Sequence, residues 1–493
     1  MKILRICFCA LIGLITFLYA LLFSSACWIF YYFGPVSFWQ IAAHCFESPK
    51  YLPSGAIVVI VLNLLLCAAI AASVGVLIFR LFEMSRKRIG RFGGITVVTL
   101  STIATGLIGY ELFWWGDTTF NLRQILANEL TPTSLFTDYC RVTSSLAVDT
   151  AAKRKNLIVI ISESLEQGFA EGLECGENLI PELADWQSHH HRFLGQKQVL
   201  GTDYTAGALM SFFYGIPKIT YVKMCLDRLD GNYPRLAVPS IWDIFLTKGY
   251  DCLYCQGGDY EFASKKNLFP VHERMRLIGQ TELENDPAYA SERGHPFFGV
   301  QDKITIRRFK AELTELSRDE RPFAAVLLTL DTHGPYGWVD SSESVHYESR
   351  VANSVAVQGR LLAELLDWLS RQPFYANTSV VVVGDHLFWY NDRAVTNGRV
   401  VYNAVKPFDG FVGFDSSSGS FSKHTAFAAF DWAPTLLELA GMEIPDGRFG
   451  LGTSLLDKTP TLLEQVGVSG FERLLQGSAY DFQKVCLKKT SEQ

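Results

Sequence analysis

The sequence predicts an α/β domain with a mostly parallel sheet flanked by helices, preceded by helices that cross a membrane. From Lys153 onward, short β-branched runs alternate with helical segments, which is typical of parallel strands joined by helices. Before residue 116, by contrast, three long runs are almost free of charge. A chain of 493 residues, 49% of them hydrophobic, is long enough for both parts.

The three apolar runs cover residues 6–33, 57–79 and 95–115. Each is long enough to cross a hydrocarbon core of about 30 Å as a helix. The first run resembles a secretory signal, but it is long and no clear small-residue cleavage site follows it, so we expect it to be retained. The loop between the second and third runs is basic, and the positive-inside rule places such loops in the cytoplasm. Its cationic residues are Arg80, Arg86, Lys87, Arg88 and Arg91. We therefore expect the chain after residue 115 to lie outside.

The charge and the cysteine content limit the class of partner and the type of cysteine site that we expect. The formal net charge is −6 and no basic tract follows the membrane region, so we expect no nucleic-acid partner. Six of the eleven cysteines fall in the exported part, which permits three disulfides without specifying any. The pair Cys252-Leu-Tyr-Cys255 lacks a second pair to complete a metal knuckle, so we interpret it as structural thiols or a disulfide.

Polar side chains follow three predicted buried strands. The strands cover residues 156–162, 324–330 and 379–384, and further helices are predicted at 240–248, 354–370 and 432–440. The first strand runs into Ser162-Glu163-Ser164, the second into Asp331-Thr332-His333, and the third into Asp385-His386. In open α/β sheets the ligand lies beyond the carboxyl ends of the strands, so we expect Glu163, His333, Asp385 and His386 to converge. Gly384, just before the last pair, is expected to allow a tight turn.

A further candidate is Thr205, which begins an apolar run after a glycine-containing turn in residues 200–217. Threonine is favoured as a helix N-cap, and the amides and dipole that reward the cap also attract phosphate. Alone, such a threonine is more often only a cap. Two carboxylates, an imidazole and a threonine oxygen together suit Mn²⁺, Zn²⁺ or Mg²⁺, and such an ion would lower the pKa of the Thr205 hydroxyl.

These segments resemble a known superfamily. Glu163 after a strand, Gly201-Thr-Asp-Tyr-Thr205, Leu330-Asp-Thr-His333-Gly-Pro-Tyr336 and Gly384-Asp385-His386 are similar to the alkaline-phosphatase-type sulfatase superfamily. Within it, they resemble the membrane-anchored phosphoglycerol transferases, which include lipoteichoic acid synthases and periplasmic-glucan phosphoglycerol transferases. The resemblance covers about residues 156–456. It implies a membrane domain over 1–116 with about three transmembrane helices, a connector over 117–152, and an extracytoplasmic sulfatase-like catalytic domain over 153–493.

The resemblance also implies a mechanism. One divalent metal, Mn²⁺ before Zn²⁺ or Mg²⁺, would be held by Glu163, Thr205, Asp385 and His386. Thr205 would be the nucleophile, and His333 would contact the phosphoryl oxygens or shuttle a proton. The donor would be phosphatidylglycerol: Thr205 takes the glycerol phosphate, diacylglycerol leaves, and a hydroxyl of an envelope glycan or polymer attacks the phospho-threonine. Such a protein is expected in the bacterial inner (cytoplasmic) membrane, multi-pass, with its catalytic domain on the periplasmic or extracellular side.

Within the family the sequence is closer to the glucan phosphoglycerol transferases. Ala263 and Lys265 stand near positions where lipoteichoic acid synthases carry Trp and Arg, and Gln256 stands near a position where they carry His. Gln256, Phe262, Lys265 and His333 are therefore candidates for substrate contacts, although the first three are equally compatible with ordinary loop residues.

Other readings remain open. A phosphoethanolamine transferase on the same fold usually has more membrane helices and a different stretch around the threonine. A sulfate-ester hydrolase needs a Cys or Ser nucleophile in a Pro- and Arg-containing setting, which is absent around Thr205, and a phosphate-ester hydrolase is a related alternative. A non-catalytic lipid-sensing protein would be expected to lack metal ligands. Finally, His272, His424 and the run 189–191 are interpreted as structural or solvated histidines.

Overall fold

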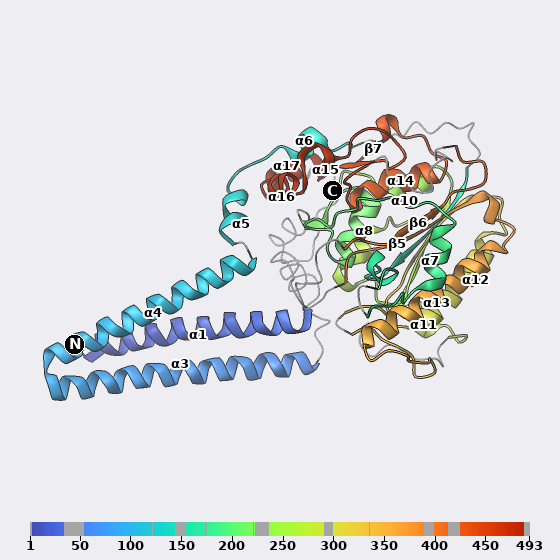
Figure 1. The fold of residues 1–493 in the computed structure, drawn as a ribbon. Coiled ribbons are helices and arrows are strands. Elements are labelled where there is room, and N and C mark those ends of the chain that lie inside the picture. The colour runs from blue at the N-terminus through green and yellow to red at the C-terminus, as the bar shows by residue number, and fades with distance from the viewer. Residues whose placement is uncertain are drawn as a thin grey trace. The chain divides into compact units, whose positions relative to one another are not determined.

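The computed structural model describes two compact units, which divide between Ala127 and Asn128 (Figure 1). The described residues are 2–33, 54–120, 122–142, 154–172, 175–219, 221, 236–289, 299–334, 336–388, 399–412 and 424–487.

The first unit consists of three long helices, α1 (Lys2–Phe33), α3 (Ser54–Ile89) and α4 (Arg91–Phe120). The segments Ile6–Ser25, Val58–Ile89 and Arg91–Leu112 are long and apolar enough to cross a membrane, which confirms the predicted apolar helices. Many of their large apolar side chains are exposed, as expected for helices that face lipid. Helix α3 packs against both α1 and α4. The turn between α3 and α4 is made by Gly90, whose φ of 73° favours glycine.

The second unit is built around a six-stranded sheet in the order β3-β2-β4-β1-β5-β6. The first five strands in this order are mutually parallel, and only β6 runs antiparallel, to β5, so the predicted mostly parallel sheet is confirmed. The strands are β1 (Asn156–Ser162), β2 (Asp251–Gln256), β3 (Met275–Ile278), β4 (Phe323–Leu328), β5 (Thr378–Gly384) and β6 (Asn403–Lys406). Every residue of β1, β4 and β5 is buried, which explains why these strands read as continuous apolar runs.

Helices cover both faces of this sheet. Alternate residues of β1 belong to different hydrophobic clusters: Val159 and Ile161 to one, Ile158 and Ile160 to the other. The first face is covered by α8 (Thr205–Tyr214), α10 (Ile241–Thr247) and α14 (Trp432–Leu439), and the second by α7 (Pro181–Ser188), α12 (Asp302–Leu316) and α13 (Arg350–Ser370). The predicted helices at 240–248, 354–370 and 432–440 correspond to α10, α13 and α14. Helix α13 begins earlier than predicted because Ser349 caps it, accepting a hydrogen bond from the Ala352 amide.

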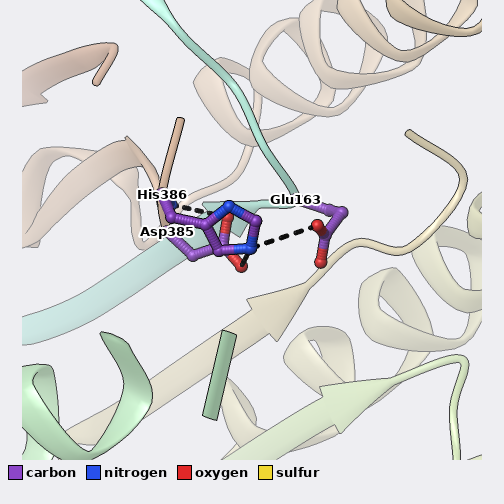
Figure 2. Close-up of side chains that lie close together, drawn as sticks. All are labelled: Glu163, Asp385 and His386. Carbon is purple, nitrogen blue, oxygen red and sulfur yellow. Dashed lines mark hydrogen bonds and ion pairs between the residues drawn. The ribbon is translucent and has the colours of Figure 1, made fainter. Parts of the chain in front are cut away.

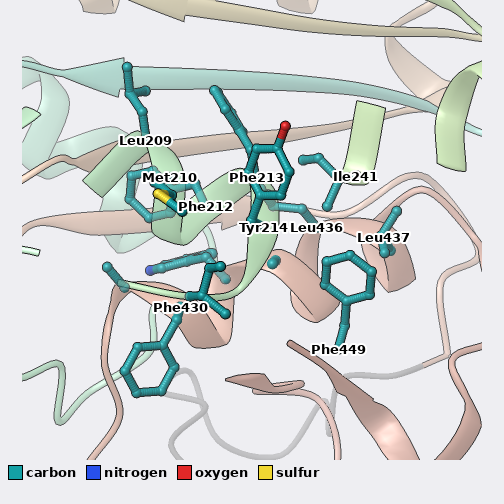
Figure 3. Packing of buried hydrophobic residues seen from close by; sticks show 14 of the residues in the cluster. Leu209, Met210, Phe212, Phe213, Tyr214, Ile241, Phe430, Leu436, Leu437 and Phe449 are labelled. Atoms are coloured by element: carbon teal, nitrogen blue, oxygen red, sulfur yellow. The ribbon is translucent and has the colours of Figure 1, made fainter. Parts of the chain in front are cut away.

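Helix α8 is almost entirely buried, and it supplies much of the first cluster. Its residues Leu209, Met210 and Phe213 pack among side chains of α10, α14 and the short strand β7 (Arg448–Phe449) (Figure 3). Because packing surrounds the helix, its N-terminal residue is held in a fixed position. That residue is Thr205, and the N-cap is Tyr204, without a side-chain cap hydrogen bond. The predicted N-cap role of Thr205 is therefore wrong: its hydroxyl does not close the helix and is available for another partner.

The remaining elements are short. They are the helices α5 (Leu122–Glu129), α6 (Leu135–Tyr139), α11 (Gln280–Asn285), α15 (Leu462–Val466), α16 (Val468–Gln476) and α17 (Ala479–Cys486), the hairpin strands β7 (Arg448–Phe449) and β8 (Gly452–Thr453), and the 3₁₀ turns η2 (Gln167–Phe169), η3 (Phe262–Leu268), η4 (Tyr375–Asn377), η6 (Ala429–Asp431) and η7 (Pro445–Gly447).

Gly384 is required by close packing and not by a left-handed turn. A Cβ atom at this last residue of β5 would lie 2.0 Å from the carbonyl oxygen of Leu165 and 2.9 Å from Val401 Cγ1. The φ of Gly384 is not among the positive values found at other glycines of the chain. The backbone after β1 thus passes directly over the end of β5, which brings the residues that follow the two strands together.

We expect Gly384→Ala to destabilise the second unit by about 1–3 kcal/mol, because the added methyl group must displace backbone. Gly470→Ala is the matched control: its Cβ would meet only Val466, at 3.5 Å, in helix α16. That control should be neutral or stabilising by up to about 1 kcal/mol. The apparent thermal midpoint of the full chain in detergent measures both effects, and equal midpoints for the two variants would contradict the packing argument.

Candidate functional site

Two neighbouring parallel strands bring together three side chains that could hold a metal ion. Glu163 follows β1, and Asp385 and His386 follow β5; the last residues of the strands, Ser162 and Gly384, are paired in register. One ligand atom from each of the three side chains lies within 4.8 Å of the others, and all three residues are buried (Figure 2). The convergence predicted from the strand ends is present in the structure for these three residues.

Thr205 joins the group from a third element, the N-terminus of α8. Its Oγ1 donates a hydrogen bond to Glu163 Oε2 at 3.0 Å and lies 3.4 Å from His386 Nε2. The structure therefore places all four predicted metal-site residues together, although they are far apart in the sequence.

The arrangement of charges fits a divalent cation. Asp385 Oδ2 is buried and has no hydrogen-bond donor among the residues that the structure describes; its ion-pair neighbour is His386 Nε2, at 3.4 Å. A buried carboxylate oxygen without a donor is costly, and a bound cation would remove that cost. The donor set of two carboxylates, one imidazole and one hydroxyl is suited to Mn²⁺, Zn²⁺ or Mg²⁺.

The pKa shifts of these three residues reflect an excess of negative charge in the cluster. Burial, followed by the charge of Glu163, raises the pKa of Asp385 to about 7. Burial would also raise the pKa of Glu163, but His333, His386 and the hydroxyl donors Ser164 and Thr205 outweigh it and lower that pKa. Burial opposes the charged form of His386, yet Asp385 and Glu163 raise its pKa. The cluster thus has surplus negative charge that positive groups stabilise.

Ser164 fixes both carboxylates. Its hydroxyl donates to Glu163 Oε1 at 2.8 Å, and its amide donates to Asp385 Oδ1 at 2.7 Å. The same oxygen of Asp385 also accepts the amide of His386, at 2.8 Å. Ser164 has a φ of 53°, a left-handed conformation that is unusual for a residue with a side chain. Sequence reasoning did not assign Ser164 a role; the available signal was a hydroxyl residue adjoining an acidic residue at a strand end.

His333 is positioned by the segment after β4. The Thr332 hydroxyl donates to the carbonyl of Glu163, and the ring Nδ1 of His333 donates to the carbonyl of Gly334 at 2.9 Å. The carboxylate of Asp302, the first residue of α12, accepts the amides of Leu330 and Asp331 and so holds this segment. His333 lies near enough to Glu163 to influence its pKa.

Lys265 and Phe262 lie on η3. Lys265 is buried, and its Nζ lies 5.7 Å from the centre of the Phe262 ring. Burial lowers its pKa to about 8, against the opposing charges of Glu163, Asp259 and Asp385. The ammonium group is thus within the electrostatic reach of the acidic cluster. Two preceding residues, Ala263 and Ser264, both have a φ of 55°, which gives the turn its shape.

Gln256, at the end of β2, has both ends of its amide bonded within the domain. Its Oε1 accepts from the Tyr254 hydroxyl at 2.9 Å, and its Nε2 donates to the carbonyl of Gly258 at 2.9 Å. A substrate contact by this side chain would have to share or exchange these hydrogen bonds. It stays a prediction.

The remaining histidine and cysteine candidates are placed away from this group. His424 is held between Glu464 Oε2 and the carbonyl of Asp457, each at 3.0 Å, and His272 is exposed. Cys252 and Cys255 belong to different hydrophobic clusters on opposite faces of the sheet. They are therefore structural thiols and not a disulfide with each other.

We expect Ser164→Ala to weaken Mn²⁺ binding by about 10- to 100-fold while the fold is retained, because an orienting partner of a ligand is lost. Ser264→Ala is the matched control, since Ser264 also has a left-handed backbone but no hydroxyl hydrogen bond to Glu163. Equilibrium dialysis of the purified chain against Mn²⁺ measures both variants. Equal affinities for the two would show that Ser164 does not orient the ligands.

The sulfatase family profile matches residues 155–442. Proteins named phosphoglycerol transferase I from Citrobacter koseri and Salmonella newport are 27% identical over 246 residues, which is 48% of this chain and 31% of theirs. The chain thus matches about a third of the length of these curated relatives.

Solved structures of similar proteins include the lipoteichoic acid synthase LtaP from Listeria monocytogenes, with 17% identity, a TM-score of 0.48, and coverage of 66% of this chain and 81% of that chain. The lipooligosaccharide phosphoethanolamine transferase EptA from Neisseria meningitidis has 14% identity, a TM-score of 0.48, and coverage of 88% and 84%. The family profile spans more than half of the sequence and includes Glu163, Thr205, His333, Asp385 and His386. The chain belongs to the sulfatase family, as its strand-end motifs predict.

Proposed function

We propose that this chain is a membrane-anchored phosphoglycerol transferase. It would transfer glycerol phosphate from phosphatidylglycerol to a hydroxyl of an envelope glycan or polymer and release diacylglycerol. The observation that carries the proposal is the Thr205 hydroxyl, which is hydrogen-bonded to Glu163 beside Asp385 and His386. The names of the curated relatives support the choice of glycerol phosphate as the transferred group.

Glu163, Thr205, Asp385 and His386 would hold one divalent metal, for which Mn²⁺ is our first choice and Zn²⁺ or Mg²⁺ the alternatives. Such an ion lowers the pKa of a bound hydroxyl and offsets charge that builds up on a phosphoryl group. The protein's own contribution is orientation: Glu163 accepts the Thr205 hydrogen bond, and Ser164 keeps Glu163 and Asp385 in place.

The reaction would have two displacements. In the first, Thr205 Oγ1 attacks phosphorus, the bond from phosphorus to the diacylglycerol oxygen breaks, and diacylglycerol leaves with a proton. In the second, an acceptor hydroxyl attacks the phospho-threonine, and the Thr205 oxygen leaves and regains a proton. His333 would contact the phosphoryl oxygens or carry one of these protons, and Lys265 would balance phosphate charge. Phe262 and Gln256 complete the proposed substrate contacts.

The anchor gives the proposed location. Three helices that could span the membrane, with basic residues at the turn between α3 and α4, favour a cytoplasmic N-terminus and an extracytoplasmic second unit. We accordingly propose a bacterial inner-membrane protein with a membrane domain over 1–116, a connector over 117–152 and a catalytic domain over 153–493. A lipid donor in the same membrane would then be available to a tethered catalytic domain.

We expect Thr205→Ala to reduce transfer from labelled phosphatidylglycerol by about a thousandfold or more, because it deletes the nucleophile. Stability should change little, since the hydroxyl forms no helix cap. Thr205→Ser retains a hydroxyl and should retain measurable transfer. The assay is the release of diacylglycerol by the full chain in phosphatidylglycerol-containing vesicles with added Mn²⁺.

The same labelled donor tests the intermediate. Acid quenching in the absence of acceptor should leave label on the peptide that contains Thr205, and mass spectrometry should locate glycerol phosphate on that residue. Undiminished transfer by Thr205→Ala would refute the assignment of the nucleophile. Turnover of a phosphoethanolamine lipid with none of phosphatidylglycerol would instead assign another substrate to the same site.

The Lys265 ammonium predicts a pH dependence. Because burial lowers its pKa to about 8, the positive charge is present below that pH and is lost as the pH rises through it. We expect the KM for phosphatidylglycerol to rise above pH 8 in the wild type. Lys265→Arg should keep KM low at higher pH, and Lys265→Met should raise KM at every pH.

Lys266→Met is the matched control for the pH profile. Lys266 is exposed and bonds to Glu261 Oε1 at 2.7 Å, so its loss should leave the profile unchanged. A KM that rises above pH 8 in the Lys265→Met variant as well would assign the titration to another group.

A further inference from the structure

Two buried cysteines from opposite ends of the second unit lie on segments that pack against each other. Cys140 follows helix α6, and Cys486 is the last residue of helix α17; their exposed fractions are 7% and 0%. Both are free thiols in the structure, and Cys140 is near enough to Cys486 to raise its pKa. Helices α6 and α17 pack together (Figure 1). The rings of Phe136 and Phe482 meet edge to face at a centroid distance of 5.0 Å.

The backbone around both cysteines is fixed by hydrogen bonds. The Asp481 carboxylate of α17 accepts the amides of Phe136 and Thr137, at 2.6 and 3.0 Å, and so holds the start of α6. Beside Cys140, Arg141 exchanges two backbone hydrogen bonds with Gly450, at 2.7 and 3.1 Å. Thus α17 and the β7–β8 hairpin hold the segment that carries Cys140 from both sides.

The other end of the contact is held in the same way. The carbonyl of Cys486 accepts the amide of Ala237 at 2.7 Å. The packing of the two segments that carry the cysteines is therefore fixed by the surrounding backbone and does not depend on the two cysteine side chains.

The other described cysteines of this unit do not compete for either thiol. Cys252 and Cys255 lie within the sheet on opposite faces, and Cys175 is exposed. Among the cysteines that the structure describes in this unit, Cys140 and Cys486 are thus the buried pair carried by two segments that pack together.

We propose that Cys140 and Cys486 form a disulfide bond in the exported protein. This inference rests on the proposed extracytoplasmic placement, because disulfides persist in oxidising compartments. The bond would form by thiol–disulfide exchange with a protein disulfide donor. One sulfur–sulfur bond of the donor breaks and one forms between Cys140 and Cys486, and the donor leaves as a dithiol with the two protons and two electrons.

The disulfide would form before the second unit has finished folding. The neighbouring Cys140 thiol and burial both raise the pKa of Cys486, and the thiolate is the attacking form in exchange. In the folded unit the reactive form is therefore scarce. Exchange should precede the packing of α6 against α17.

A Cys140–Cys486 disulfide would close nearly the whole second unit into one covalent loop. It would restrict the unfolded chain and so favour the folded state. It would also attach the C-terminal helices to the segment that leads from the membrane helices, so a single backbone cut after Val142 would not separate the unit from its anchor. This consequence gives a direct test.

The experiment uses the full chain with a protease recognition sequence inserted between Val142 and Arg154. The protein is purified after free thiols are blocked with N-ethylmaleimide, cut, and run in SDS with and without reductant. We expect one band of full-length size without reductant and two fragments with it. Peptide mass spectrometry of the uncut wild type should detect the Cys140 peptide linked to the Cys486 peptide.

Single variants show which cysteines are bonded. Cys140→Ser and Cys486→Ser should each give two fragments without reductant, whereas Cys175→Ser and Cys225→Ser should still give one band. Two fragments from the wild type without reductant, or maleimide on Cys140 of the wild type, would overturn the proposal. Loss of the link in Cys175→Ser or Cys225→Ser would also overturn it, in favour of another pairing.

This outcome is separable from the proposed function. Diacylglycerol release is measured on the same preparations. Transfer without the linked Cys140 and Cys486 peptides would refute the disulfide but not the proposed transferase. Linked peptides without transfer would refute the proposed transferase but not the disulfide. The peptide analysis of the wild type decides the question even where a serine variant fails to fold.

Discussion

The site depends on the close approach of two parallel strand ends. Strands β1 and β5 are in register up to Ser162 and Gly384, and only a residue without a Cβ fits where the backbone of Leu165 passes over β5. This contact brings Glu163 beside Asp385 and His386. The left-handed turn at Ser164 follows from it, because the chain must leave β1 sharply while its amide still reaches Asp385. The geometry of this candidate metal site is therefore set by the packing of the backbone, which fixes where the three side chains start.

Surplus negative charge is the second constraint. Two buried carboxylates, Glu163 and Asp385, face one imidazole in close contact, and a buried Asp385 oxygen has no hydrogen-bond donor among the described residues. Such an arrangement is costly unless a cation is present, since burial opposes ionised groups. The buried ammonium group of Lys265 lies within electrostatic reach of both carboxylates but forms no direct ion pair with either in the described structure. A positive group beyond the ligands is suited to meet an anionic substrate rather than to neutralise the ligands.

The sequence was sufficient to predict the strands that are buried on both faces of the sheet. Strands β1, β4 and β5 were predictable because continuous apolar runs mark central parallel strands, and their polar ends then identified Glu163, His333, Asp385 and His386. Strands β3 and β6, of four residues each, went unpredicted because β3 is partly exposed and Asn403-Ala-Val-Lys406 has only two apolar residues. The roles of Ser164 and Asp302 were not predictable either, since each acts through one specific hydrogen-bond geometry that no periodicity encodes.

The sequence pattern around Thr205 is compatible with two local structures. A threonine before an apolar run predicts an N-cap, in which the side-chain oxygen turns back to the helix amides. In the structure the cap position falls one residue earlier, at Tyr204, so Thr205 is the first helical residue and its hydroxyl points to Glu163. The first amides of any helix have no partner within the helix, and their partial positive charge favours an anion near the start of α8. A capping threonine would use its hydroxyl to satisfy one of those amides. Displacement by a single residue instead places the Thr205 hydroxyl at the helix terminus without using it as a cap, and this arrangement suits the nucleophilic role that we propose for Thr205.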